Sequence, residues 1–323
     1  MDSGSGDMAT IRTIRPTDLI SLVAFFRDGS HQEVTARVWP EVWGNSNTRA
    51  VWHLVSRLIT RPGDSHAWVC LANGGVSSLG VARPRPGKLA WDVEDLFVAE
   101  GRMSAAVDLL EHVATETARR GGRRVFLSTP ADDDLARIAK QAGFVNYTSE
   151  TLCTCPSPAA ASDIDLPRPR PRLRQDTQAL FQLYNAAVPC RVRSAEAVTL
   201  DEWMSLQKGG RLWAPSIGGS RQHFVWENGN TVTGWLQLSS GAKSQHLELL
   251  VHPSHLEELD AMVEYSLGLL NPRVPAYASA RDYQPELLSA LERWGFTGVA
   301  DCLVFSRELT VRVPTRALVP AGA

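Results

Sequence analysis

Two carboxylates alternate along one strand-like run of the chain, in the segment WDVEDLFV. Side chains two positions apart lie on the same face of a β-strand, so strict alternation places Asp92 and Glu94 beside Leu96 and Val98. Paired carboxylates on one strand face can raise each other's pKa, which makes Glu94 a candidate for proton chemistry. The alternative is a solvated edge or a structural pair held by salt bridges.

The residues that follow this run have the character of an anion site. The turn-like stretch 100–102 leads into a helix-like segment that begins with Met103, Ser104 and Ala105. Backbone N–H groups at a helix N-terminus attract anions, and no side chain here obviously caps them. Arg102 can add a positive charge that meets a phosphate. A purely structural turn is the alternative.

Two groups of residues have metal-ligating side chains without a metal-binding spacing. Three histidines follow one another closely near Glu248: His246, His252 and His255. Cys153 and Cys155 lie two positions apart in a strand-like run. A metal site needs convergent ligands, and the run HPSHLEE does not have the HExxH pattern. Histidines that hydrogen-bond and cysteines that simply pack are commoner, so we expect no metal.

Tryptophans gather in the segment RVWPEVWGNSNTRAVWHL. Indoles can form an apolar or cation-binding pocket, and Trp39 and Trp43 are therefore candidates for a substrate pocket. They can equally be core residues between helices and a sheet.

Composition limits the class of protein. A chain of 323 residues suggests about two domains, and 44% hydrophobic with 21% charged residues is typical of globular proteins. A net charge of −2 gives no reason to expect nucleic acid or an anionic membrane as partner. No apolar run approaches the roughly 20 residues of a membrane span, and the start is no secretory signal. Five cysteines match no disulfide framework, so we expect a cytoplasmic protein.

An internal repeat organises the chain around the proline-rich stretch 156–172, which reads as a linker. Matching segments on its two sides lie at nearly constant offsets. They are the strands around Gly80 and Gly234, the runs ending at Val98 and Val251, and the Gly-Phe pairs at Gly143 and Gly295, separated by 154, 153 and 152 positions. Asp18 and Asp176 each precede the first helix-like segment. The repeat predicts a duplicated domain.

Periodicity predicts the order βααβββαβαβ in each half. In the first half, helices are expected near 17–28, 47–61, 103–119 and 132–141, and strands near 66–72, 76–84, 88–98, 123–128 and 144–154. The main helix of the second half is expected at 255–270.

This ordered set resembles the GNAT superfamily of acyl-CoA N-acyltransferases. The resemblance lies in the glycine-centred strands, in the pair VEDLFVAEGRMSAAVDLL and LELLVHPSHLEELDAMV, and in the late AGF and WGF. It implies an α/β (α+β) protein of two tandem GNAT-like domains, each with a mixed, mostly antiparallel sheet flanked by helices. The domains are 1–155, with 1–8 as a flexible lead-in, and 173–323, joined by the linker 156–172.

The family binds CoA at a glycine-rich loop after its fourth strand, and neither half keeps that motif. The resemblance nevertheless implies acetyl-CoA as acyl donor in the first half, with Glu94 as catalytic base. The implied CoA-binding residues are Phe97, Val98, Arg102, Met103, Ser104 and Ala105. The tyrosine acid of many relatives is replaced by Ala139 and Leu291, and water can take its role.

The second half is less suited to an anion. Glu257, Glu258 and Asp260 occupy the first turns of its main helix, and Ser254 with Glu257 forms a capping-box pattern that would use the free N–H groups. The position that matches Glu94 there is Leu247. These differences favour the first half as the active copy.

The resemblance therefore implies an acyl-CoA-dependent N-acyltransferase, most simply an N-acetyltransferase. Its acceptor would be a small-molecule or peptide amine, with no nucleic acid or membrane as partner, and the chain would be a monomer or homodimer. The alternative is a catalytically inactive tandem GNAT-fold protein that binds a ligand or partner. An open V between the fourth and fifth strands favours the enzyme, whereas a filled cleft favours the binding protein.

Overall fold

The computed structural model describes residues 10–29, 31–35, 65–72, 75–159, 168–197, 199–209, 220–229 and 231–310. The helix expected at 47–61 and the candidate pocket residues Trp39 and Trp43 lie outside these residues.

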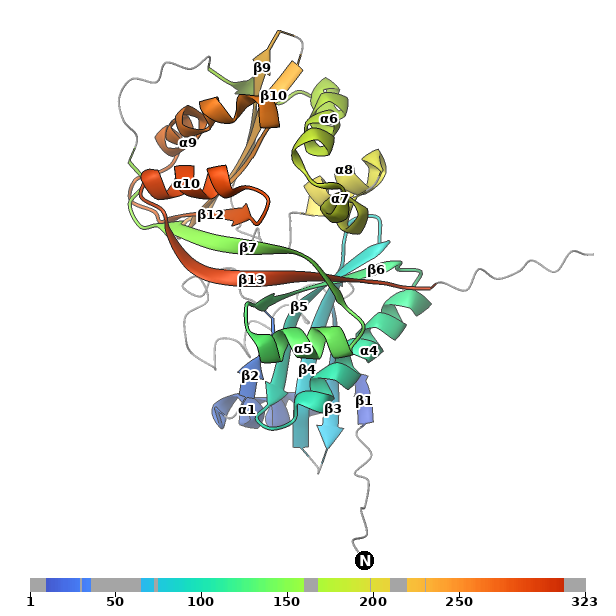
Figure 1. The fold of residues 1–323 in the computed structure, drawn as a ribbon. Coiled ribbons are helices and arrows are strands. Elements are labelled where there is room, and N and C mark those ends of the chain that lie inside the picture. Colours follow the sequence, from blue (N-terminus) through green and yellow to red (C-terminus); the bar gives the residue numbers. More distant parts are fainter. Residues whose placement is uncertain are drawn as a thin grey trace, which may run out of the picture.

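The described elements of the first half follow the order that the periodicity predicts, apart from β2 (Figure 1). Its elements are β1 (Thr10–Thr13), η1 (Pro16–Asp18), α1 (Leu19–Arg27), β2 (His31–Glu33), β3 (His66–Ala72), β4 (Gly75–Pro84), β5 (Ala90–Ala99), α4 (Met103–Arg119), β6 (Arg124–Pro130), α5 (Asp133–Gln141) and β7 (Val145–Cys155). The three-residue strand β2 was not expected.

The second half repeats this order. Its elements are β8 (Arg170–Pro171), η2 (Arg174–Asp176), α6 (Thr177–Ala187), α7 (Cys190–Glu196), α8 (Leu200–Gly209), β9 (Ser220–Asn228), β10 (Thr231–Ser240), β11 (Gln245–Val251), η3 (Pro253–Glu258), α9 (Leu259–Gly268), β12 (Ala276–Arg281), α10 (Pro285–Arg293) and β13 (Thr297–Glu308). The end of the proline-rich stretch thus forms an edge strand, the position where proline is tolerated.

The repeated aspartates have the same role in both halves. Asp18 accepts hydrogen bonds from the two terminal nitrogens of Arg12, at 2.7 and 2.6 Å. Asp176 accepts two from Arg170, at 2.7 and 2.8 Å. Each arginine lowers the pKa of its aspartate through these hydrogen bonds. Each pair fastens the first strand of its half to the turn that opens the first helix.

The repeated glycines explain how the long helices approach the sheet. A Cβ on Gly80 would lie 3.1 Å from Leu109 Cδ2 in α4, and a Cβ on Gly234 would lie 3.0 Å from Met262 Cε in α9. A side chain at either position would push the helix away from the strand. Glycine therefore allows the same close packing in both halves.

The two halves exchange their last strands. Within the described residues, the sheet runs in the order β1-β3-β4-β5-β6-β13-β7-β12-β11-β10-β9-β8, with β2 beside β5. β13 of the second half pairs with β6 of the first, and β7 of the first pairs with β12 of the second. Figure 1 shows β7 and β13 crossing the middle of the molecule together. Each half thus lends its closing strand to the other.

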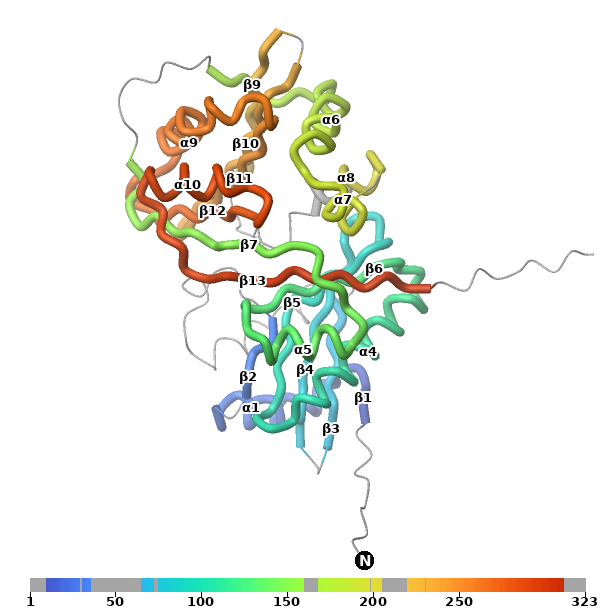
Figure 2. Tube along the Cα trace, in the orientation of Figure 1, coloured from blue at the N-terminus to red at the C-terminus, as the bar shows by residue number. Residues whose placement is uncertain are grey.

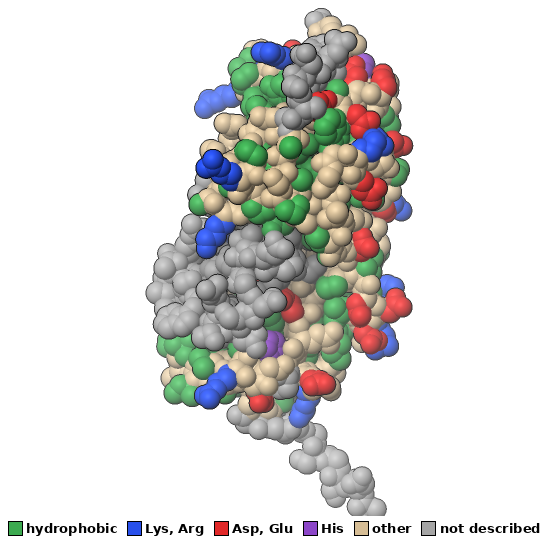
Figure 3. All heavy atoms as spheres, turned by 90° about the vertical axis from the view of Figure 1, so that its left-hand side faces the viewer, with side chains coloured by type: hydrophobic (Ala, Val, Ile, Leu, Met, Phe, Trp, Pro, Cys, Tyr) green, Lys and Arg blue, Asp and Glu red, His purple; other side chains and the backbone are tan. Residues whose placement is uncertain are grey.

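Helices cover both faces of the sheet. In the second half, α9 and α10 lie on one side of β9–β11 and α6–α8 on the other (Figure 2). Among the described residues, no helix combines the length and apolar character that a membrane span requires. On the face in Figure 3, Asp and Glu line one edge, whereas Lys and Arg are scattered.

Candidate functional site

A V-shaped divergence opens between β5 and β6. The two strands pair in parallel only from Ala90 opposite Arg124 to Asp92 opposite Phe126. The β4–β5 ladder also shifts register, because Val93 lies opposite Ala82 and Asp95 lies opposite Val81. Glu94 is therefore the extra residue of a β-bulge, at the point where β5 leaves β6.

The bulge overturns the expected alternation. Val93, Leu96 and Val98 belong to the core under α4, whereas Phe97 packs with α1 on the opposite face. Asp92 lies opposite Arg83, and Arg83 approaches Glu94 at 3.8 Å, so both carboxylates lie on the α1 face. Asp92 and Glu94 share a face as expected, but Leu96 and Val98 do not share it. The inserted residue reverses the sides of everything after it.

Asp92 and Glu94 each have an arginine nearby. Asp92 accepts from Arg85 Nε at 2.8 Å, and Arg85 Nη2 lies 2.7 Å from its Oδ1. Glu94 lies farther from its arginine, with Arg83 Nη1 3.8 Å from Glu94 Oε1, and its side chain is 20% exposed. Asp92 is thus held in a structural ion pair, and Glu94 is the carboxylate better placed for chemistry.

β2 occupies the space that the divergence opens. It runs antiparallel to β5, with His31 opposite Ala99 and Glu33 opposite Phe97. The other edge of β5 is already paired with β4 along Phe97 and Val98. β2 therefore lies on the edge of β5 that faces β6, as Figure 1 shows.

The residues after β2 extend this pairing to the bulge. The Val34 N–H donates to Leu96 O at 2.8 Å. The Leu96 N–H donates in turn to Thr35 Oγ1 at 3.1 Å. Val34 is fully buried and Thr35 is 3% exposed. Sequence reasoning did not find this segment, because three alternating residues are too few for a strand signal.

The start of α4 keeps the features of an anion site. Gly101 has a φ of 73°, and no side chain caps the helix among the described residues. Arg102 and Ser104 are exposed, and the first turn contains no acid. The N–H of Ala105 is used, since it donates to Arg102 O at 2.9 Å. Of the three predicted residues, Ala105 is therefore the one whose N–H is already used in this turn.

The start of the corresponding helix in the second half differs from expectation. It is a 3₁₀ segment with a kink at His255, and α9 begins only at Leu259. His252, not Ser254, is the cap, since its Nδ1 accepts from the Ser254 N–H at 3.2 Å. The predicted Ser254–Glu257 capping box was wrong because the kink changes the geometry of that turn.

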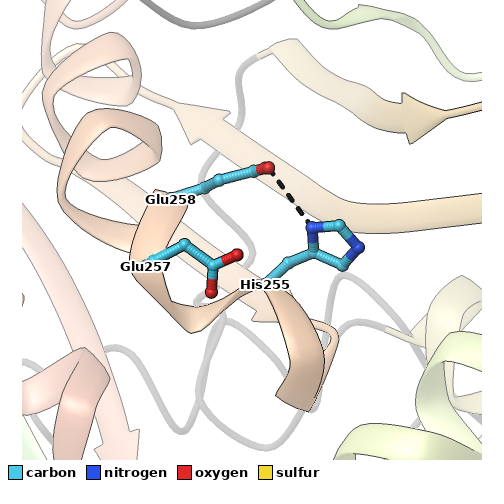
Figure 4. Close-up of side chains that lie close together, drawn as sticks. All are labelled: His255, Glu257 and Glu258. Carbon is cyan, nitrogen blue, oxygen red and sulfur yellow. Dashed lines mark hydrogen bonds and ion pairs between the residues drawn. The ribbon is translucent and has the colours of Figure 1, made fainter.

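Three side chains at this start come close together (Figure 4). The ligand atoms of His255, Glu257 and Glu258 lie within 4.8 Å of one another, and His255 Nδ1 lies 3.2 Å from Glu258 Oε1. Neither His246 nor His252 belongs to this group. Two carboxylates here would repel an anion.

The second half also has a divergence. β11 and β12 pair only from Gln245 opposite Ala276 to Leu247 opposite Ala278. A groove of about 370 Å³ lies between η3, α9 and α10, lined by Leu256, Leu259, Pro285, Glu286, Ser289 and Arg293. The β10–β11 ladder has no register shift over its described pairs. Counted from the repeated glycines, the inserted Glu94 has no counterpart in β11, where Leu247 was expected to match it.

The positions of the missing tyrosine acid are core positions. Ala139 and Leu291 are fully buried in α5 and α10. A side chain at either place contributes to packing and cannot reach a groove.

Solved structures with a similar fold match nearly the whole length of this chain. A GCN5-related N-acetyltransferase from Sphaerobacter thermophilus has 14% identity and a TM-score of 0.55, covering 93% of this chain and 95% of that chain. A tandem GNAT protein from the clavulanic acid biosynthesis pathway has 14% identity and a TM-score of 0.51, covering 93% of this chain and 98% of that chain. This chain has the tandem GNAT fold.

The likeness to the tandem GNAT protein covers nearly the full length of both chains, so it includes both halves. Neither protein-family profiles nor curated proteins gave a match to the sequence. At 14% identity the shared GNAT fold does not carry the substrates of these proteins over to this one.

Proposed function

We propose that this protein is an acyl-CoA-dependent N-acyltransferase whose donor site lies in the first half. The observation that carries the proposal is the junction of β5 and α4. There the strands diverge at the Glu94 bulge, and the exposed, uncapped start of α4 carries Arg102 and no acid. The kinked η3, which ends in Glu257 and Glu258, offers no equivalent in the second half.

In this proposal the residues divide the work between binding and proton transfer. Arg102 and the N–H groups of Met103 and Ser104 hold the diphosphate, and the backbone of Phe97 and Val98 lines the acyl chain. Glu94 accepts a proton from the acceptor amine. The amine nitrogen then bonds to the thioester carbon, the C–S bond breaks, and the thiolate leaves and takes a proton from water.

The ligand-free arrangement sets a condition on this activity. β2 uses the same edge of β5, and Thr35 takes the Leu96 N–H that would otherwise face a thioester carbonyl. The acyl donor can enter only when the segment 31–35 leaves. Donor binding must therefore overcome the hydrogen bonds of β2, and anything that weakens them strengthens donor binding.

Titration calorimetry with acetyl-CoA tests the proposal on the full chain. Thr35→Val keeps the side-chain size but leaves the buried Leu96 N–H unpaired in the closed form, a loss of about 1–3 kcal/mol. We expect acetyl-CoA to bind Thr35→Val about 5- to 150-fold more tightly than the wild type. Thr115→Val is the control, because Thr115 donates only to Glu111 O on the exposed side of α4.

The variant Arg102→Glu tests which of the two halves binds acetyl-CoA. It should abolish binding, whereas Ser254→Gly should leave binding unchanged. Binding that is lost with Ser254→Gly instead would place the donor in the second half. Absence of binding at millimolar acetyl-CoA in both wild type and Thr35→Val would eliminate the transferase.

The pairing of β2 with β5 favours a second candidate, a non-catalytic tandem GNAT-fold protein. In this candidate β2 is a permanent part of the sheet. A protein without catalysis needs no tyrosine acid, so buried Ala139 and Leu291 can take those positions. Hydrogen exchange separates the two candidates. Protection of the Val34 and Leu96 amides should fall when acetyl-CoA is added to the enzyme, and should be unchanged in the binding protein.

A further inference from the structure

Three metal-ligating side chains converge where η3 meets α9 in the second half (Figure 4). Each of His255, Glu257 and Glu258 offers one ligand atom, and these atoms all lie within 4.8 Å of one another. We call these three residues the η3 cluster. The donor site proposed for the first half does not use them.

The kink in η3 brings the cluster together. In a regular helix, residues two positions apart do not face each other, so His255 and Glu257 would point apart. His255 instead has φ −132° and ψ 26°, which is not helical, and its ring lies beside both carboxylates. The convergence therefore depends on the backbone break, which the spacing along the sequence does not show.

The distances within the η3 cluster suit a metal ion. Zinc ligands lie about 2.0–2.2 Å from the ion, so two nitrogen or oxygen ligands of a tetrahedral site are about 3.3–3.6 Å apart. His255 Nδ1 and Glu258 Oε1 are 3.2 Å apart. The carboxylate of Glu257 is farther away but within 4.8 Å, and rotation of this exposed side chain can close the gap.

A second imidazole lies beside the η3 cluster. The ring centroids of His252 and His255 are 6.2 Å apart, whereas two imidazoles on one tetrahedral zinc ion have centroids roughly 5 Å apart. The Nδ1 of His252 is used inside the turn, where it accepts from the Ser254 N–H at 3.2 Å. Its Nε2 is therefore the nitrogen that can act as a fourth ligand.

The charges around the cluster favour a cation. Asp260, in the following turn, is paired with Arg293, whose Nη2 lies 2.7 Å from Asp260 Oδ1. Among the described residues, no lysine or arginine forms an ion pair with Glu257 or Glu258. Their two negative charges therefore repel each other, and a divalent cation between them turns this repulsion into attraction.

The types of the donor atoms indicate which metal fits. Mg²⁺ and Ca²⁺ take oxygen ligands, whereas imidazole nitrogen suits zinc and neighbouring transition metals. We propose that the η3 cluster binds one Zn²⁺ ion, with His255, Glu257 and Glu258 as ligands and His252 in the fourth position. The ion would join η3 to the first turn of α9. This binding does not depend on acyl transfer, because no residue of the first-half donor site takes part in it.

Titration calorimetry of the full chain with zinc chloride tests the proposal, without acyl-CoA and without a histidine tag. We expect one Zn²⁺ per chain, and magnesium chloride should bind at least about a hundredfold more weakly. Because a ligand that binds only the folded protein stabilises it, zinc should also raise the melting temperature, and a chelator should reverse the rise. No binding at submillimolar zinc would overturn the proposal.

Two variants remove one ligand each. His255→Ala and Glu257→Gln should each weaken zinc binding by at least about tenfold, since even the outer partners of metal ligands have effects of this size. Without zinc, Glu257→Gln should melt at the temperature of the wild type or above it, because it removes a repulsion and no packing. Glu264→Gln is the matched control, since it neutralises a carboxylate of α9 outside the cluster and should keep full affinity. Equal zinc affinity in the wild type, His255→Ala and Glu257→Gln would overturn the proposal.

Two further variants check the fourth ligand and a competing site. His252→Asn keeps a side-chain acceptor for the Ser254 N–H but removes the imidazole nitrogen, and it should weaken zinc binding severalfold. Unchanged affinity would overturn the place of His252 in the site. Cys190→Ser removes an exposed thiol that can bind zinc and should leave the affinity unchanged. Loss of binding in Cys190→Ser would place the ion at that thiol and overturn the proposal.

Discussion

At the scale of single residues, one insertion decides which side chains can act together. Glu94 is the extra residue between Val93 and Asp95. Each later residue of β5 therefore lies on the face opposite to the one that strict alternation predicts. A bulge is a local break in the backbone pairing, and no residue type in VEDLFV announces it. The carboxylates could be found from the sequence, whereas their surroundings depended on the partner strand.

The uncapped start of α4 was more accessible to sequence reasoning. An uncapped helix start depends on neighbouring residues only, and the structure has no side-chain cap at α4 within the described residues. The opposite case is Ser254, where a matching pattern failed because the kink at His255 altered the turn. Local patterns predict well while the backbone stays regular.

The pH dependence of stability follows from His223. Its pKa in the folded protein is about 4, below the 6.5 of an ordinary histidine. The neutral ring is therefore favoured by folding, so its contribution is fully present above pH 6.5 and is lost as the pH falls toward 4. We expect the free energy of unfolding to fall by at most about 3 kcal/mol from this group over that window.

Urea unfolding between pH 7.5 and 4.5 measures this loss. His66 and His112, whose pKa values are also lowered by burial, contribute in the same direction. His223→Gln removes the contribution of His223 alone and should flatten the profile. A mutant profile parallel to that of the wild type would contradict the prediction.

At the scale of elements, long periodic segments were predicted almost to the residue. The apolar stripe of α4 placed the helix at 103–119, its observed bounds. β2 was not predicted because three residues are too few to show a periodic pattern. It nevertheless pairs with β5 at the candidate site. Its position depends on the free edge of β5, a property of the assembled sheet.

The turn between α4 and β6 gives a test of close packing. A Cβ on Gly122 would lie 2.4 Å from Thr117 Cγ2 and 3.0 Å from the Thr117 carbonyl oxygen. Thr117 is fully buried and the oxygen is backbone, so neither can move easily. We expect Gly122→Ala to lower the free energy of unfolding by about 1–3 kcal/mol in a denaturant titration.

Gly75→Ala is the comparison for this experiment. Its added Cβ would meet only the Ala72 carbonyl oxygen, at 4.0 Å. This substitution should change the stability by less than about 0.5 kcal/mol. A similar loss in both variants would mean that general glycine effects, not the contact with Thr117, set the cost.

At the scale of the whole molecule, the duplication was visible in the sequence but the strand exchange was not. Constant offsets between matching segments reveal a repeat, but they do not tell which half each closing strand joins. β7 and β13 follow similar helices, so the sequence suits pairing within a half as well as across the halves. We expected domains 1–155 and 173–323, and the exchange makes each of them incomplete by one strand.

Separate expression of the halves tests the exchange. Residues 1–155 alone lack β13, which lies between β6 and β7. We expect this piece to aggregate or to unfold without a cooperative transition, because it exposes two strand edges. Co-expression with 156–323 should restore a soluble complex that melts in one step. An isolated first half with a sharp melting transition would show that β7 can close its own sheet.

The exchange also bears on how a cell makes this protein. Ser128 in β6 donates to Leu303 in β13, a neighbour 175 positions later in the chain. At about 5–20 residues per second, a ribosome completes the first strand roughly 9–35 seconds before the second. During that interval β6 waits with an open edge, and nascent chains on one messenger are exposed to mispairing with each other. The sheet of the first half can therefore be completed only after β13 (Thr297–Glu308) has been made.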